Sequence, residues 1–548
     1  MVWMIPWCPR GWARPRRSAP NAGTRPRAAG VPRNKAGFLL HLGLLCCVVA
    51  GGILLSFCSA RAAEFGASVE EQVREIVLEN GLTILVLERP FAPVFHYVGM
   101  VDAGASDEPS GRTGVAHLME HMAFKGSVRV GTQDARAEAE ALRRVDEAWE
   151  AVLAEKRADL LERGDSARAA AAWARFQEAQ READRYVIGN AFSKTLEENG
   201  VQGLNASTSC DATTYYYSLP SNKLELWALM EGNRMTWPVF REFYAEREVV
   251  IEERRMRLES SPRGRLRDET SSAAFVAHPY RNGVIGHRSD LEALSRADGE
   301  EFFREHYGAA NMCMVLVGDV RRDEVEKLAR KYLADIPRGS RNQPILTREP
   351  PPSAERMVRT REPAQPLCYV AYHGGPAFHD PRFDRVSALT DILSGGRSSR
   401  LYRALVKERR IATGVSCFNG MPGLKYDNLI WCSATPASGV APDSLVEALQ
   451  QEFEAIAQRP ITPEELEGHR SRALADFVRG LRGDQGLASL LAFYQIRTGD
   501  WRNLFRWLDD LEALTPESIT EEAARILRRS NRTVGILEEA GNARRSGS

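Results

Sequence analysis

The feature that most constrains the fold of this chain is an internal repeat. A strand, a turn with Gly and Asp, and an amphipathic helix occur at residues 93–122 and again at 366–393. Each half also closes with a helix and an apolar strand, at 311–318 and at 531–537. A repeated order of elements indicates a duplicated structural unit. We therefore predict an α+β fold of two homologous domains, each a mostly antiparallel sheet layered with helices.

Composition places the boundaries between these units. Gly and Pro cluster at residues 339–356, which we interpret as a linker between an N-terminal domain at 69–338 and a C-terminal domain at 357–540, with a short tail at 541–548. Residues 132–188 are rich in Ala, Glu and Arg and have heptad-like apolar spacing. This pattern predicts an inserted helical hairpin, and packing on itself is favoured over a partner-binding coiled coil.

The first 63 residues differ from the rest. Basic residues and prolines without any acidic residue precede an apolar stretch at 37–58, and small residues follow at 59–63. This order is typical of a signal peptide, with cleavage after Ala62 or Ala63. An uncleaved anchor is the alternative, because about 20 apolar residues can also span a bilayer. Either interpretation predicts a periplasmic or exported protein that meets a membrane only through an uncleaved leader.

Charge and cysteine usage exclude some classes of function. The chain has 73 basic and 73 acidic residues and a formal net charge of zero, so no overall field favours nucleic acid, and we predict no nucleic-acid partner. Five cysteines follow the leader, and none has CxxC spacing. We therefore expect neither a disulfide framework nor a cysteine zinc site. Cys313, inside an apolar run, is expected to be a buried strand residue.

The motif His117-Leu-Met-Glu120-His121 carries the clearest chemical signal. Two histidines four residues apart on a helix project from one face at a separation that a single zinc ion can bridge, and Glu120 points the same way. In the second copy of the repeat, Leu389-Thr390-Asp391-Ile392-Leu393 stands where the first has its histidines. We predict one metal site in the N-terminal domain, and the alternative is a pair of ordinary histidines on a polar helix face.

A catalytic zinc ion needs a third protein ligand and one open position. Residues 245–254 are expected to form a helix on which Glu246 and Glu253, seven apart, share a face. Spacing alone favours solvated charges among arginines for this pair.

The His-x-x-Glu-His order is the inverzincin signature, and the chain resembles the insulinase or pitrilysin family, which includes mitochondrial processing peptidase. The likeness covers nearly everything from Val73 onward except the inserted hairpin. It implies that Glu253 is the third ligand of one Zn²⁺ per chain and that Glu246 is a carboxylate that orients the site. The insert accounts for the long interval between His117 and Glu253.

Further matches to the family concern the substrate. Residues 203–209 resemble an edge strand to which an extended peptide adds, which implies that Asn205, Ala206 and Ser207 contact substrate. His278, in a His-Pro-Tyr sequence that also matches, is expected to be structural.

The resemblance predicts a zinc-dependent endopeptidase with Glu120 as general base, acting on peptides or unfolded polypeptides. Many active relatives also carry an Arg and a Tyr seven apart in the second domain, but the aligned positions here are Val406 and Thr413. This departure predicts a heterodimer with a paralogue that supplies the pair. A catalytically idle zinc-bearing scaffold or substrate-guiding subunit is the alternative function, and a metal-free binding module is a third.

Overall fold

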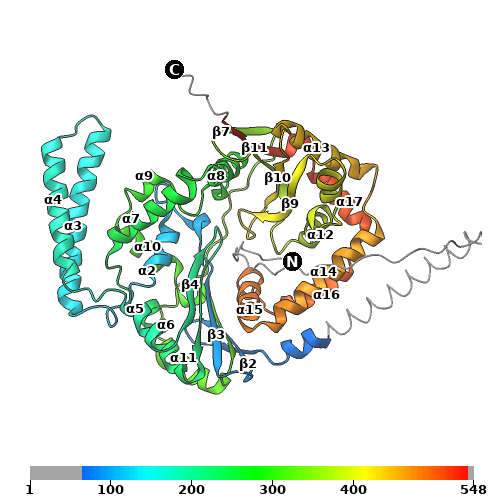
Figure 1. The fold of residues 1–548 in the computed structure, drawn as a ribbon. Helices are drawn as coiled ribbons and strands as arrows, with labels where there is room; N and C mark the ends of the chain where they lie inside the picture. Colours follow the sequence, from blue (N-terminus) through cyan, green and yellow to red (C-terminus); the bar gives the residue numbers. More distant parts are fainter. Residues whose placement is uncertain (1–63, 541–548) are drawn as a thin grey trace, which may run out of the picture.

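The computed structural model describes residues 64–540, so the predicted leader at 1–63 and tail at 541–548 lie outside the described residues. Two α+β domains lie side by side (Figure 1). Each has a mixed sheet, in which β2 pairs with β6 and β7 with β11 in parallel and all other pairs are antiparallel. The predicted α+β fold with two layered, mostly antiparallel sheets is therefore confirmed.

The N-terminal sheet has the strand order β1-β2-β6-β3-β5-β4. Its hairpin β1-β2 turns at Asn80-Gly81, where Gly81 has a φ of 90° that favours glycine. Strand β4 lies at the open edge. The strands are β1 (Arg74–Val77), β2 (Thr83–Glu88), β3 (Val94–Val101), β4 (Gln202–Thr208), β5 (Thr213–Pro220) and β6 (Met312–Gly318). The helices of this domain include α2 (Val115–Met122), α5 (Ala191–Glu198), α6 (Leu224–Thr236), α7 (Phe243–Arg254), α10 (Arg296–His306) and α11 (Arg322–Tyr332).

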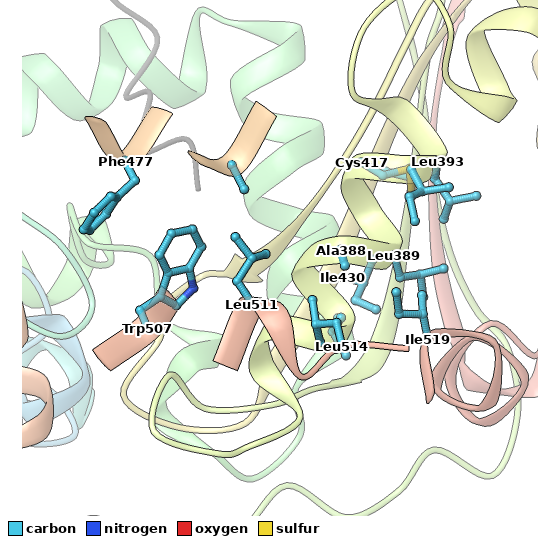
Figure 2. Close-up of a cluster of buried hydrophobic side chains, with 14 of the residues drawn as sticks. Ala388, Leu389, Leu393, Cys417, Ile430, Phe477, Trp507, Leu511, Leu514 and Ile519 are labelled. Carbon is cyan, nitrogen blue, oxygen red and sulfur yellow. A yellow bond between two sulfur atoms is a disulfide. The ribbon is translucent and has the colours of Figure 1, made fainter. Parts of the chain in front are cut away.

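The C-terminal sheet has the order β7-β11-β8-β10-β9. Its strands are β7 (Arg356–Glu362), β8 (Leu367–Gly375), β9 (Ala412–Met421), β10 (Asn428–Pro436) and β11 (Arg532–Glu539), and its helices include α12 (Phe383–Ser394), α13 (Pro442–Glu454), α14 (Pro463–Arg482), α16 (Asn503–Glu512) and α17 (Pro516–Ile526). The apolar face of α12 is buried in this domain. Figure 2 shows Leu389 of α12 near Ile430 of β10 and Ile519 of α17.

Each domain also supplies a helix to the other domain's sheet. Helix α8 (Pro262–Ala274) follows the N-terminal site helices but packs on β7, β8 and β11. Its Leu266 joins the buried cluster of Tyr369 and Trp431. In the reverse direction, α15 (Asp484–Thr498) packs on β3 and β6, and its Leu491 is buried together with Val315. The two domains therefore share their cores, which fixes their relative position.

A helical hairpin projects from the N-terminal domain (Figure 1). It consists of α3 (Ala135–Leu160) and α4 (Ser166–Asp184), and each helix begins after an aspartate, Asp134 or Asp165, that accepts two backbone N–H bonds. Between the helices, Trp149 and Phe176 pack with ring centroids 4.9 Å apart. Apolar spacing at three and four residues gives the two helices one shared buried seam.

The structure also contains a disulfide between two cysteines whose spacing in the sequence did not predict a bond. Cys417 and Cys432 face each other on neighbouring strands β9 and β10 and form a disulfide. The expectation of no disulfide framework missed this pair, because strand register brings together residues that share no sequence motif. Cys313 is fully buried in β6.

Among residues 64–540 no helix combines the length and apolar character needed to cross a membrane.

Candidate metal centre

Helix α2 presents both histidines of the motif on one face, with His117 buried and His121 half-buried. It begins at Gly114, whose φ of 91° and close approach to the Ile285 carbonyl leave no room for a side chain. Glu108 caps the helix, since its carboxylate accepts hydrogen bonds from the N–H groups of Gly114 at 2.9 Å and Ala116 at 2.8 Å. Burial raises the pKa of Glu108 well above its usual range. Sequence reasoning missed Glu108, although an acidic residue shortly before a helix is a capping signal.

Helix α7 brings Glu253 to the two histidines. Its Oε2 atom lies 3.7 Å from His117 Nε2 and 3.7 Å from His121 Nε2, and the three donor atoms lie within 4.8 Å of one another. These separations exceed a hydrogen bond but approach the ~3.4 Å between ligands of a tetrahedral zinc ion with bonds of about 2.1 Å. Residues that lie 136 positions apart in the sequence thus form a candidate metal site, and this donor set fits zinc.

The protonation of His117 suits metal binding. Its ring is buried, and burial, with His121 and Arg257 nearby, lowers its pKa to about 3. The ring is therefore neutral at physiological pH, as a metal ligand must be. Its Nδ1 atom has no hydrogen-bond partner among residues 64–540.

Glu246 contacts His121 but is not one of the three candidate metal donors. Its Oε2 atom is 3.3 Å from His121 Nδ1, and its Oε1 atom is 2.6 Å from Lys125 Nζ. The hydrogen bond with His121, helped by Lys125, lowers the pKa of Glu246 to about 2. A carboxylate at Nδ1 holds the imidazole so that Nε2 faces the metal position.

Glu120 faces the same space without joining the three donors. Thr208, at the end of β4, donates a hydrogen bond from Oγ1 to Glu120 Oε2 at 2.7 Å. Burial raises the pKa of Glu120 above its usual value, and the Thr208 bond opposes that shift. Thr208 was not singled out from the sequence, because nothing local links it to a residue 88 positions earlier.

A cavity of about 560 Å³ opens onto this centre. Asn205, Ala206 and Ser207 line it from the edge strand β4, whose outer side has no neighbouring strand among the described residues. The C-terminal domain contributes Met421 and Pro422 to the lining. The predicted substrate residues and the candidate metal donors therefore border one space between the domains.

The positions aligned with the Arg and Tyr of active relatives lie elsewhere. Val406 packs against the C-terminal core, and Thr413 lies near the start of β9 with its hydroxyl facing the Thr435 carbonyl at 3.4 Å. Neither residue lines the cavity. His278 is buried and accepts a hydrogen bond at Nδ1 from the Tyr280 N–H, so it caps a turn.

Two α+β domains with a His-x-x-Glu-His helix in the first define an architecture of the zinc-peptidase type. Residues 88–144 and 184–288 match the family described as Insulinase (Peptidase family M16), and residues 293–473 match the Peptidase M16 inactive domain. The chain belongs to peptidase family M16, the insulinase family. Most of the hairpin falls in the gap between the first two matched segments.

Curated relatives agree with this assignment. Zinc protease PqqE of Helicobacter pylori is 26% identical over 467 residues, which cover 81% of this chain and 89% of the relative. A probable mitochondrial-processing peptidase subunit beta of Schizosaccharomyces pombe is 22% identical over 277 residues, covering 50% and 47%.

Solved structures share the fold. A protease from Helicobacter pylori superposes with a TM-score of 0.68 at 22% identity, covering 85% of this chain and 99% of that one. The periplasmic protease PqqL from Escherichia coli gives a TM-score of 0.64 at 17% identity, covering 86% and 48%.

Proposed function

We propose that this chain is a zinc-dependent endopeptidase that hydrolyses peptides or unfolded polypeptides outside the cytoplasm. The observation that carries the proposal is the convergence of His117, His121 and Glu253, with both histidine Nε2 atoms 3.7 Å from one carboxylate oxygen. The predicted leader and the periplasmic location named for PqqL support an exported site of action.

Each residue of the centre has a distinct task in this proposal. His117, His121 and Glu253 would hold a zinc ion, which would supply Lewis-acid chemistry and acidify a bound water molecule. Glu120 would act as general base, accepting a proton from the attacking water and returning it to the leaving amine. Thr208 holds the Glu120 carboxylate, and Glu246 holds the ring of His121. Asn205, Ala206 and Ser207 pair with the substrate backbone as an added strand.

The lack of the Arg and Tyr pair at Val406 and Thr413 supports a partner. A transition-state oxyanion needs hydrogen-bond donors, and the C-terminal residues that line the cavity, Met421 and Pro422, offer no side-chain donor. We propose that a paralogue supplies the missing donors in a heterodimer. The Schizosaccharomyces pombe relative is itself named as a subunit.

The alternative is a zinc-bearing but catalytically idle subunit that guides substrate to a partner. The intact Glu120, positioned by Thr208, favours catalysis over this alternative. Both candidates predict bound zinc, so peptide turnover decides between them.

Glu120→Gln tests the proposal. The variant should retain about one zinc per chain, because Glu120 is not among the three donors, and should lose roughly 10²- to 10⁴-fold in turnover, the usual contribution of a general base. Zinc content and cleavage of a peptide library are measured on the full chain, alone and with the co-expressed paralogue.

Glu253→Gln serves as the matched comparison and should lose zinc as well as activity. A chelator should abolish cleavage by the unaltered chain, and added zinc should restore it. Unchanged cleavage by Glu120→Gln would refute the assignment of the base, and a chain that binds zinc but cleaves nothing with its paralogue would favour the idle subunit.

A further inference from the structure

Three arginines line the cavity beside the metal centre. Arg257 lies in the π-helical turn Arg255–Glu259 that continues α7, Arg267 lies on α8, and Arg281 ends the 3₁₀ turn Pro279–Arg281. All three belong to the N-terminal domain, and all three are exposed. Three separate segments therefore each contribute an arginine to the lining of one cavity. No motif in the sequence predicted this convergence.

These guanidinium groups retain donors for a ligand. Arg257 Nη2 pairs with Glu253 Oε1 at 2.8 Å, which leaves its other nitrogens available. The bond from Arg281 Nη1 to the Val276 carbonyl is long, at 3.4 Å. Arg267 has neither a hydrogen bond nor an ion pair with any residue between 64 and 540. Each guanidinium carries five N–H donors in a planar fork that fits a carboxylate.

The charges of the cavity favour an anion once the metal is bound. Its acidic residues are Glu120, Glu253 and Asp268, which balance the three arginines. A divalent ion at the centre would add two positive charges and would be partly neutralised by the negative charge of Glu253. Away from the centre, Arg267 and Arg281 share the cavity lining with one acidic residue, Asp268, so the lining contributed by α8 and the 3₁₀ turn carries a net positive charge.

The geometry of the edge strand connects this wall to a peptide. Side chains of an added strand alternate between its two faces, so every second residue of a peptide on β4 points to the same side. The cavity is bordered by β4 and by the segments that carry the arginines. Carboxylate side chains of the peptide would form charge-assisted bonds there, whereas lysine or arginine side chains would meet like charge.

We propose that the cleft selects acidic peptides, with Arg267 and Arg281 as the residues that determine this specificity. The inference rests on the proposed peptidase function, because it names the substrate class of the same site.

Binding to the zinc-loaded Glu120→Gln chain tests the proposal without turnover. Three fluorescent peptides that differ only in carrying Glu, Gln or Lys at alternate positions are compared by anisotropy. The Glu peptide should bind on the order of tenfold more tightly than the Gln peptide, as one hydrogen bond to a charged group provides, and the Lys peptide should bind most weakly. The difference should shrink as salt increases.

Charge variants assign the effect to the two arginines. Arg267→Gln with Arg281→Gln should abolish the preference, and Arg267→Glu with Arg281→Glu should reverse it. Arg181→Glu is the matched control, because Arg181 lies on the surface of the hairpin and pairs with Glu178; it should leave the preference unchanged. If a variant fails to fold, the affinities of the three peptides for the chain with native arginines still test the preference.

Each outcome of these experiments either supports or overturns the inferred preference for acidic peptides. Equal affinity for the three peptides, no binding of any, or a preference that survives both arginine changes would overturn the inference. If the unaltered chain with zinc and its paralogue cleaves all three peptides at equal rates, the peptidase function stands and the specificity fails. If the Glu peptide binds preferentially but no peptide is cleaved, the specificity stands and the peptidase function fails.

Discussion

At the scale of single residues, Asp391 shows what the second copy of the repeat does with the position of the metal motif. It lies on α12, and its Oδ2 atom is 2.8 Å from His469 Nδ1 and 2.7 Å from Arg472 Nη2. Burial alone would raise the pKa of Asp391, but these hydrogen bonds hold it below its usual value of 3.8. The C-terminal domain therefore uses this place for a structural ion-pair cluster.

The lowered pKa of Asp391 predicts a pH-dependent contribution to stability. The charged form is favoured in the folded state, so its contribution is complete above the unfolded pKa of 3.8 and is lost as pH falls through the lower folded value. Asp391→Asn should lower the free energy of unfolding by about 1–3 kcal/mol at pH 7. The difference from the unaltered chain in urea unfolding should narrow at pH 3, and an equal difference at both pH values would contradict the prediction.

At the scale of elements, the inserted hairpin supports the helix that carries Glu253. Trp149 of α3 packs on Tyr244 of α7 at 4.9 Å, and the Arg247 guanidinium lies 4.3 Å from the Trp149 ring centroid. At the base of the hairpin, Glu138 forms a buried ion pair with Arg241, just before α7. The outer side of α7 is thus held by the insert while its inner side faces the metal position.

Removal of the Trp149 ring should therefore weaken zinc retention as well as stability. Trp149→Ala should cost about 3–5 kcal/mol of unfolding free energy, typical of a large buried aromatic residue, and should release zinc to a chelator faster. Trp173→Ala on the same hairpin is the control, because Trp173 is 42% exposed, and it should change either quantity little. Equal zinc release from the two variants would argue that α7 does not depend on the insert.

At the scale of the whole molecule, Asp211 joins the edge strand to the other domain. It follows β4, and its carboxylate accepts hydrogen bonds from the Tyr280 hydroxyl at 2.6 Å and from the N–H of Lys425 at 3.0 Å. Arg497 of α15 donates to its carbonyl at 2.6 Å. The loop that follows the edge strand β4 is therefore tied to the domain that supplies the opposite side of the cavity.

Loss of the Asp211 carboxylate should loosen this connection. Asp211→Ala leaves buried donors without an acceptor, at about 1–3 kcal/mol for each, and hydrogen exchange should accelerate at residues 203–209 and 421–426. Asp335→Ala is the control at an exposed aspartate. Unchanged exchange in both segments would show that the shared cores alone hold the domains.

Much of the fold and part of the site could be predicted from local sequence. The repeated order of elements predicted two domains, apolar spacing predicted the hairpin, and the spacing of His117 and His121 placed two potential ligands on one helix face. Both depend on helix and strand periodicity, which is a property of neighbouring residues. Glu253 and Glu246 were identified through resemblance, since their own spacing favoured solvated charges.

Only the tertiary structure determined the contacts between residues that lie far apart in the sequence. It placed Glu253 at both imidazoles, Thr208 at Glu120, Cys417 beside Cys432 and three arginines around one cavity. It also exchanged α8 and α15 between the two sheets. Sequence alone determined which side chains each helix or strand presents on one face. The long-range contacts follow from how the sheets and helices pack against one another, and this packing is a property of the whole chain.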